Sequence, residues 1–197
     1  MQHLRDEELM CEYKKGNGFA MDEIIRRYKN PVYRFLLRLC RAQAEAEDIA
    51  QEVFLRVHQY RLSYVPSGKF STWIFSIAHN LFIDNLRKRR WLVAWPHKNN
   101  EESDDDPVEF ASTALSAAEE TERNELAEVV KSCIQDLPFL QKEALVLREY
   151  EQMEYEEIAA ILKKPLGTIK TLIYRARENL KNKLLPRIEG DRGGKNA

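Results

Sequence analysis

Apolar residues recur at helical spacing in the first half of the chain. Two stretches follow the i, i+3, i+4, i+7 pattern that turns one face of a helix toward a core. The first, within residues 44–60, consists of Ala46, Ile49, Ala50, Val53, Phe54 and Val57. The second consists of Phe70, Trp73, Ile74, Ile77, Ala78 and Leu81. Strands would require alternating polar and apolar positions, and no such run of useful length is present, so we predict a helical bundle over residues 1–97.

Turn-forming residues indicate where these helices begin and end. The segment 63–68 contains Pro66 and Gly68, interrupts the helical pattern and predicts a loop. Pro31 suits the first turn of a helix, so we expect an earlier helix to begin there and to run through Cys40.

The last third of the chain carries a second set of helical patterns. An apolar stripe covers residues 126–137, and further helices are expected at 139–150 and at about 155–162. Residues 163–167 break the pattern, and a long basic helix starts near Thr168. Two helices joined by a short glycine-containing turn, the second of them basic, predict a helix-turn-helix domain over residues 125–187. The chain is therefore expected to be all-α, with two small helical domains.

The distribution of charge divides the chain into three blocks. The formal net charge is −1, which excludes a protein that is basic throughout. Residues 1–97 carry a net charge of +5, residues 98–128 a net charge of −9, and residues 129–197 a net charge of +3. We predict that residues 98–124 form a flexible acidic linker, either a solvated spacer or a nucleic-acid mimic that occupies a basic channel. Residues 188–197 are expected to form a disordered tail.

The sequence gives no support for catalysis, for a metal or for a cofactor. The cysteines Cys11, Cys40 and Cys133 form no CxxC pair, and the four histidines are scattered along the chain. There is no glycine-rich phosphate loop, HExxH motif or nucleophile motif. No apolar run approaches the roughly 20 residues of a membrane span, and the first residues contain no apolar signal segment. We expect a cytoplasmic protein that is not inserted in a membrane.

The polar face of the last helix predicts contact with duplex DNA. Apolar positions from Ile169 to Leu184 cluster on one side of that helix, and basic and hydroxyl side chains occupy the other. Side chains of these types reach base edges and phosphates in the major groove. The alternative is a merely solvated helix face. The candidate contacts are Arg148, Thr168, Lys170, Thr171, Tyr174, Arg175, Arg177 and Lys181. Of these, Lys170 and Arg175 are the best base-edge candidates, and Arg148, Arg177 and Lys181 suit phosphates.

Two other groups of residues predict further interfaces. Asp48, Gln51 and Glu52 surround Leu55 on the polar face of the 44–60 helix, which is typical either of a docking patch for a basic partner or of a solvated face with one stray leucine. Beyond that helix, aromatic and basic residues alternate, a combination that suits single-stranded nucleic acid. These candidates are Arg56, Tyr60, Ser63, Tyr64, Phe75, Asn80, Arg87, Lys88, Arg89 and Arg90. We assign Trp73 to the core and expect Tyr64, in the loop, to lie outside it.

Both halves of the chain resemble one protein family. Residues 45–54 (EAEDIAQEVF) and 70–80 (FSTWIFSIAHN) resemble region 2 of the bacterial extracytoplasmic-function sigma factors. Residues 155–159 (YEEIA), 165–170 (PLGTIK) and 174–177 (YRAR) resemble region 4 of the same proteins. The resemblance implies a dissociable specificity subunit of bacterial RNA polymerase.

The resemblance also implies a role for each surface. Asp48, Gln51, Glu52 and Leu55 would dock on the clamp helices of the polymerase β′ subunit. The loop 63–69 and its neighbours would hold a base flipped from the melted −10 element, and the helix from Thr168 would read the −35 element as duplex. The acidic linker would run toward the active-site cleft and the RNA exit path. An anti-sigma factor would hold the two domains together.

The match to the family is not complete, and two other functions stay open. Leu172 stands where the family often has arginine, so the −35 preference is not defined, and the loop 65–68 has its own sequence, which leaves the flipped base open. One alternative is an operator-binding regulator that uses the helix-turn-helix without core polymerase. The other is a sigma mimic that sequesters an anti-sigma factor and binds no DNA.

Overall fold

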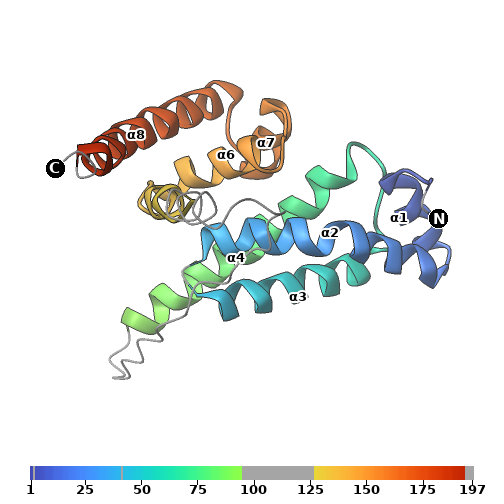
Figure 1. Ribbon diagram of the computed structural model, residues 1–197. Coiled ribbons are helices and arrows are strands. Elements are labelled where there is room, and N and C mark those ends of the chain that lie inside the picture. The colour runs from blue at the N-terminus through green and yellow to red at the C-terminus, as the bar shows by residue number, and fades with distance from the viewer. Residues whose placement is uncertain (2, 41, 95–126, 194–197) are drawn as a thin grey trace, which may run out of the picture.

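The computed structural model describes residues 1, 3–40, 42–94 and 127–193, and within these ranges the chain is helical, without a strand (Figure 1). This confirms the predicted all-α fold. Residues 127–135 are helical as well, and the predicted linker at 98–124 lies outside the described residues. The labelled helices are α1 (Asp6–Lys14), α2 (Gly18–Leu39), α3 (Gln43–Tyr60), α4 (Phe70–Ala94), α6 (Phe139–Glu149), α7 (Tyr155–Leu162) and α8 (Leu166–Gly193).

In the N-terminal half, α2, α3 and α4 pack into a bundle and α1 closes one end of it. The two apolar stripes predicted from the sequence face one another in its core, where residues such as Val53 and Ile74 are fully buried. An ion-pair network joins α1 to α2: the Arg27 guanidinium contacts Asp6 and Glu23, each at 2.7 Å. Burial of the apolar stripes stabilises the bundle, and this network fixes α1 against it.

The start of the second helix differs from the sequence-based expectation. Helix α2 begins at Gly18 and Pro31 lies inside it, so the prediction that Pro31 opens a helix is wrong. The apolar face continues on both sides of the proline, with Ala20 and Ile24 before it and Phe35 after it, all fully buried. Packing of this face outweighs the loss of one backbone hydrogen bond at the proline.

The C-terminal half is built from residues 127–135, α6, α7 and α8. Pro138 stands directly before α6, and α7 ends at Leu162 and is followed by Lys163, which adopts the left-handed backbone conformation at φ +52°. The left-handed residue turns the chain sharply, so that α8 begins three residues later. Helix α8 continues to Gly193, so residues 188–193, which we expected to belong to a disordered tail, are helical.

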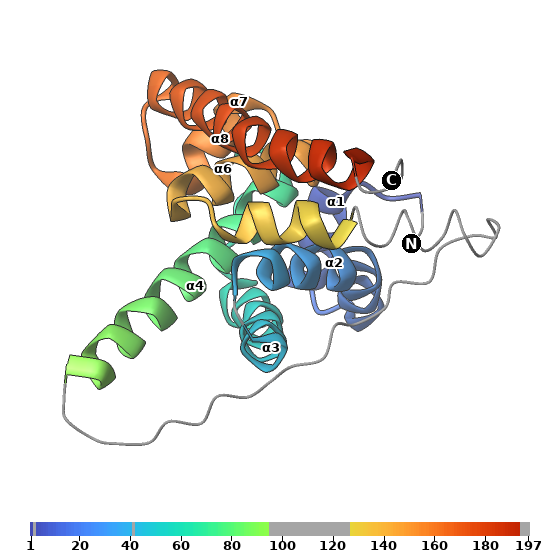
Figure 2. The ribbon, with the colours of Figure 1, turned by 60° about the vertical axis from the view of Figure 1, so that its left-hand side comes forward.

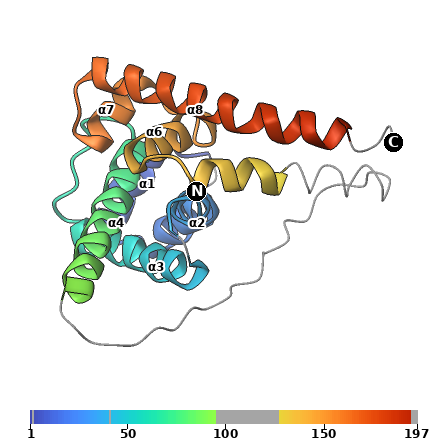
Figure 3. The same cartoon turned by 90° about the vertical axis from the view of Figure 1, so that its left-hand side faces the viewer.

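The two halves pack against one another. Helix α7 lies along α4, and α6 lies on α2 (Figures 1 and 2). Figure 3 shows α8 running along the outside of the C-terminal half, away from α3. The apolar part of this contact includes Phe82 and Phe139, whose rings are stacked with centroids 5.4 Å apart. The packing of the halves therefore leaves one face of α8 and one face of α3 open.

Candidate nucleic-acid and polymerase interfaces

One face of α8 is polar, cationic and open to solvent. Lys170, Tyr174 and Arg175 are exposed, and 67% of Tyr174 is accessible. The opposite face holds Ile169 and Ala176, both fully buried against the rest of the C-terminal half. Helix α7 packs against α8, and the short turn at 163–165 joins them. This is the arrangement of a helix-turn-helix in which α8 is the second helix.

The eight residues predicted to contact duplex DNA are not equivalent. Thr168, Lys170, Tyr174, Arg175 and Lys181 are exposed, and their side chains make no hydrogen bond or ion pair with any other described residue. Thr171 is exposed, but its hydroxyl donates to the Gly167 carbonyl at 2.9 Å, a bond within the helix. The structure therefore brings most of the predicted surface together on α8.

The other two arginines already have partners. The Arg177 guanidinium pairs with Glu149 at 2.5 Å, which raises the pKa of Arg177 through a side-chain hydrogen bond. Arg148 is half-buried, donates to the Met153 carbonyl at 2.7 Å and lies 5.0 Å from the centroid of the Tyr155 ring. Arg148 thus braces the segment between α6 and α7, and any contact that it makes with phosphate must compete with these bonds.

Helix α3 presents the predicted acidic stripe. Asp48, Gln51 and Leu55 are exposed, and 56% of Leu55 is accessible, whereas Glu52 is half-exposed and pairs with Arg56 at 2.7 Å. One exposed leucine framed by acidic and amide groups fits both a docking patch and a solvated face with a single leucine, so both interpretations of this stripe stay open at this point.

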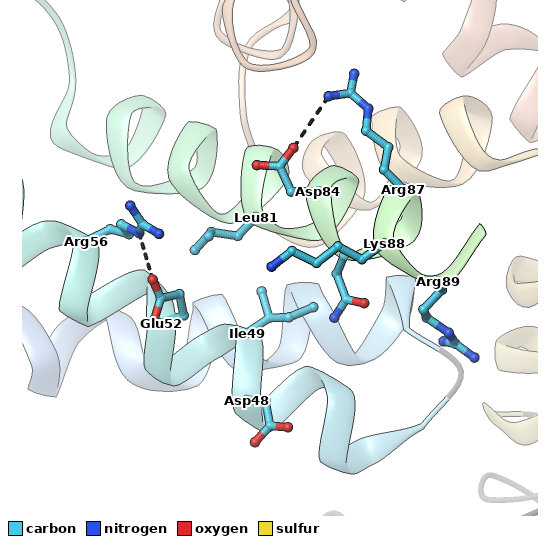
Figure 4. A pocket seen from close by; sticks show the side chains of 10 residues that line it. Asp48, Ile49, Glu52, Arg56, Leu81, Asp84, Arg87, Lys88 and Arg89 are labelled. Atoms are coloured by element: carbon cyan, nitrogen blue, oxygen red, sulfur yellow. Dashed lines mark hydrogen bonds and ion pairs between the residues drawn. The ribbon is translucent and has the colours of Figure 1, made fainter. Parts of the chain in front are cut away.

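A broad groove of about 1110 Å³ separates α3 from the second half of α4 (Figure 4). The α3 wall carries Asp48, Glu52 and Arg56, and the α4 wall carries the basic run together with Asp84, which pairs with Arg87 at 3.5 Å (Figure 4). Arg87 and Lys88 are exposed along this groove, and Arg89 pairs with Glu45 at 2.9 Å. The side chain of Arg90 lies outside the described residues. The predicted basic run is therefore accessible at Arg87 and Lys88.

Two of the predicted strand-contacting aromatics are buried instead, so their assignment to a nucleic-acid surface is wrong. Tyr64 is only 5% exposed and packs edge-on against Trp73, with ring centroids 4.9 Å apart. Phe75 is 2% exposed and packs edge-on against Phe35. Burial raises the pKa of Tyr64 to about 12, and the nearby negative charge of Glu7 adds to this shift. Both rings are part of the apolar core of the N-terminal half.

The remaining predicted residues of this surface lie at the start of the loop and on α4. Tyr60 and Ser63 are exposed, and the Ser63 hydroxyl donates to the Tyr60 carbonyl at 3.0 Å. Asn80 is also exposed, and its side-chain oxygen accepts a 3.2 Å hydrogen bond from Lys163 of the other half. One of the proposed nucleic-acid contacts is thus occupied by the chain itself.

Three residues that carry polar contacts between the halves were missed at the sequence level. Thr72 on α4 donates to Glu157 on α7 at 3.0 Å, and Lys69 pairs with the same carboxylate at 3.1 Å. The sequence held one signal, since Glu157 stands in the third position of α7, where a capping box is expected. Its second role depends on the packing of α7 against α4, which the local sequence does not encode.

The described residues contain no cluster of three or more histidine, cysteine, aspartate or glutamate side chains placed to hold a metal ion. In the same ranges, none of the helices combines the length and the apolar character that crossing a membrane requires.

Comparisons with known proteins agree with this arrangement. Residues 24–92 match the family model for sigma-70 region 2, and residues 127–180 match that for sigma-70 region 4. The chain is 30% identical to the RNA polymerase sigma-H factor of Pseudomonas aeruginosa over 92% of this chain and 95% of that protein. It is 33% identical to the ECF RNA polymerase sigma factor SigW of Bacillus subtilis over 88% of this chain and 93% of that protein. The fold resembles that of the sigma factor RpoE from Bartonella quintana, solved with the anti-sigma factor NepR, with a TM-score of 0.66, 24% identity, and coverage of 83% of this chain and 95% of that one.

A helical bundle followed by a helix-turn-helix, each matching a sigma-70 region, defines an RNA polymerase sigma factor. More narrowly, the chain belongs to the extracytoplasmic-function (ECF) family of sigma factors. The predicted family and function are therefore confirmed.

Proposed function

We propose that this sigma factor directs core RNA polymerase to promoters through three separate surfaces. The stripe on α3 docks on the clamp helices of the β′ subunit, the surface around loop 63–69 and α4 holds the melted −10 strand, and α8 reads the −35 element as duplex. The observation that supports this division best is the open cationic face of α8, which lies on the second helix of the helix-turn-helix.

Recognition of the −35 element rests on the chemistry of the α8 face. Lys170 and Arg175 are long, exposed cations that can reach base edges, with arginine suited to bidentate contact with guanine. Lys181 lies further along the helix and suits a phosphate. Phosphate contacts make binding depend steeply on salt, because each one releases a condensed counterion.

Docking on polymerase rests on Leu55 and its acidic neighbours. An exposed leucine contributes affinity when it is buried by a partner, and Asp48 and Glu52 select a basic partner surface. Because this stripe remains open while the two halves are packed together, docking requires no rearrangement of the bundle.

The −10 surface that we propose is smaller than the one expected from sequence. It retains Arg56, Tyr60, Ser63 and Asn80 together with the exposed basic run of α4. Tyr60 is the aromatic side chain available for stacking, with 43% of its surface accessible. Tyr64 and Phe75 hold the backbone beneath this surface and do not contact the strand.

Three further assignments follow from the family. We propose that an anti-sigma factor binds this chain, as NepR binds the RpoE protein whose fold is similar. Action with polymerase on the chromosome implies a cytoplasmic location. The chain contributes binding and positioning to initiation, and the chemistry of RNA synthesis belongs to the polymerase. Recovery of an inhibitory protein with the chain from its native host tests the first of these assignments.

The direct test is run-off transcription with purified core polymerase and genomic DNA, followed by mapping of start sites. We expect initiation at a limited set of promoters that share −35 and −10 elements. An operator-binding regulator would bind its site fully without core enzyme and would not co-purify with it. A sigma mimic would not bind promoter DNA and would not support a transcript.

A further inference from the structure

Helix α1 lies beside the loop that connects α3 to α4. Figure 1 shows both at the end of the bundle where α3 ends and α4 begins. The match to sigma-70 region 2 begins at residue 24, whereas α1 spans Asp6–Lys14. The family model therefore assigns no role to this helix.

Two side chains of α1 bond to the backbone on either side of the loop. The Lys14 ammonium donates to the Tyr64 carbonyl at 3.0 Å. A carboxylate oxygen of Glu7 accepts from the Phe70 amide at 2.8 Å. Glu7 and Lys14 are seven residues apart, two helical turns, so they lie on the same side of α1. Both ends of the loop are thereby bonded to one face of one helix.

The segment between these two bonds is open to solvent. Residues 65–69 are all exposed, whereas Tyr64 before them and Phe70 after them are buried. The Tyr64 and Phe70 rings pack edge-on with centroids 6.1 Å apart, so the segment leaves the bundle and returns close to where it left. Because the segment is not packed in the core, its shape depends on how its two ends are held.

The bond to Glu7 matters most for the start of α4. The first amides of a helix have no acceptor within that helix, and Phe70 is fully buried, so water does not supply one. The first turn of α4 contains no acidic residue. The Glu7 carboxylate supplies the acceptor and places a negative charge at the positive end of the α4 dipole. Glu7 thus helps to fix the residue at which the loop ends.

Helix α1 is itself firmly attached to the bundle. Leu9 is fully buried in the core. Asp6 pairs with Arg27 of α2 at 2.7 Å, and the Tyr13 hydroxyl lies 2.5 Å from Nδ1 of His58, near the end of α3. The helix can therefore act as a rigid support for the loop.

Resting on the proposed function, we propose that α1 sets the shape of the loop that receives the flipped −10 base. Glu7 and Lys14 are positioning residues, because each holds one end of segment 65–69 and neither contacts the strand. A preformed segment binds the extruded base without the entropic cost of ordering five residues during binding. A segment held at both ends also offers the base one shape, so α1 contributes to the choice of base as well as to affinity.

Amide exchange tests the hold on the loop without polymerase or DNA. Glu7→Met and Lys14→Met keep a long side chain and remove the acceptor or the donor. In each variant of the full chain we expect hydrogen–deuterium exchange over residues 62–70 to be about tenfold faster, with the buried parts of α2 and α3 unchanged. Glu12→Met and Lys15→Met are the matched controls, because these two side chains pair with each other at 2.7 Å. Wild-type exchange is expected in both controls.

Conservative variants separate the two bonds from general stability. Glu7→Gln keeps an acceptor oxygen and Lys14→Arg keeps a donor, so we expect loop exchange close to the wild-type rate in both. Far-UV circular dichroism checks that each variant is folded, and Lys14 is exposed, so Lys14→Met carries the test should Glu7→Met fail to fold. Loop exchange that is unchanged in Lys14→Met, or equally fast in Lys14→Arg and Lys14→Met, would overturn the positioning role.

Base selectivity gives the functional readout. The probes are fork-junction DNA fragments with the −35 duplex and the single-stranded −10 sequence of a promoter mapped by run-off transcription, each −10 position carrying the four bases in turn. With holoenzyme containing Lys14→Met we expect the preference for the native base at the flipped position to fall about tenfold, and binding to the −35 duplex alone to be unchanged. A general loss of stability would weaken binding to every fragment by one factor and leave the ratio between bases unaltered.

The two readouts distinguish failure of this proposal from failure of the proposed function. Faster loop exchange in Lys14→Met with an unaltered base preference would refute the role of α1 in base choice. Wild-type holoenzyme that does not distinguish the bases would refute the proposed −10 surface itself. The exchange experiment does not depend on that surface, so it still decides whether α1 holds the loop.

Discussion

The imidazole Nδ1 of His79 lies 2.6 Å from Glu143 Oε1, although the two residues belong to different halves of the chain. Desolvation raises the pKa of the Glu143 carboxyl, and the hydrogen bond from His79 opposes that shift in part. The second carboxyl oxygen, Oε2, has no hydrogen-bond partner among the described residues. The pair is therefore specific to the packed arrangement and costly to break from one side.

Removing the carboxyl while leaving the histidine gives the first prediction. Glu143→Ala leaves His79 buried without its partner and is expected to lower the free energy of unfolding by about 1–3 kcal/mol. Glu143→Gln retains an acceptor at the same place and is expected to cost less. Urea denaturation at pH 7 measures both. The control Glu178→Ala lies on the exposed side of α8, and equal stability of the two alanine variants would contradict the prediction.

A second carboxyl at the contact between the halves predicts a pH dependence. Burial raises the pKa of Glu151 to about 7, and Arg34 and Arg38 of α2 oppose the shift. The packed state therefore binds this proton more tightly than an unfolded chain, in which the ordinary value is 4.5. The protonated Glu151 carboxyl therefore contributes fully to the free energy of unfolding below about pH 4.5, and this contribution is lost as the pH rises toward 7.

Replacement of Glu151 isolates that effect. In Glu151→Gln the decline of stability between pH 4.5 and 7 is expected to be smaller than in the wild type, and stability above pH 7 is expected to be higher. Glu143 titrates in the same direction but is present in both proteins, so it cancels in the comparison. Urea midpoints across this range measure the difference, and parallel pH profiles of the two proteins would rule out the role of Glu151.

At the other end of the molecule, Glu23 predicts the opposite dependence. Hydrogen bonds from Arg26 and Arg27 lower the pKa of Glu23 to about 2. The ionised Glu23 carboxylate therefore contributes to the free energy of unfolding above pH 4.5, and this contribution is lost as the pH falls from 4.5 toward 2. We expect Glu23→Gln to be less stable than the wild type at pH 7 and the two proteins to converge in acid. Thermal unfolding between pH 2.5 and 7 tests this, and a gap that stays constant with pH would refute it.

The α8 face predicts how DNA binding responds to salt. Arg175→Ala removes an exposed cation and is expected to weaken binding to the −35 duplex by roughly 1–3 kcal/mol if the contact is to a base edge. Arg177→Ala is the comparison variant. Because Arg177 is already paired with Glu149, we expect this substitution to weaken DNA binding less than Arg175→Ala does. Titration at several salt concentrations separates base contacts, which change specificity, from phosphate contacts, which reduce the salt slope by about one. Equal losses in the two variants would contradict the assignment.

The stripe on α3 predicts a defect in assembly with polymerase. Leu55→Asp places a charge at the centre of the proposed docking patch and is expected to reduce affinity for core enzyme at least tenfold, roughly 1.4 kcal/mol. Leu62→Asp is a matched control, since Leu62 is similarly exposed but lies beyond the end of α3. Native gel titration with core enzyme distinguishes the two, and an unimpaired Leu55→Asp would remove the stripe from the interface.

Local pattern was sufficient to predict most helices of this protein. Helix α7 begins at Tyr155 and ends at Leu162, as the apolar period and the flanking breakers indicate. The exposed face of α8 follows in the same way, because Ile169, Ile173 and Ala176 fix which side is buried. These features depend on neighbours within one or two turns, and such neighbours are visible in the sequence.

Features that depend on contacts between distant segments were not predictable. Tyr64 lies in a loop by turn chemistry but is buried by Phe70 and Trp73, which follow it in α4. Pro31 carries a strong local signal for a helix start, yet the apolar face on both sides of it is packed as one surface. The polar contacts of α4 with α7 arise only when the halves meet, and no local pattern encodes them.

The exposed face of α8 and the contact of α7 with α4 are separate surfaces of one polypeptide. Lys170 and Arg175 are exposed while Lys163 is bonded to Asn80. We therefore expect the chain to meet duplex DNA through α8 without any prior rearrangement of its two halves.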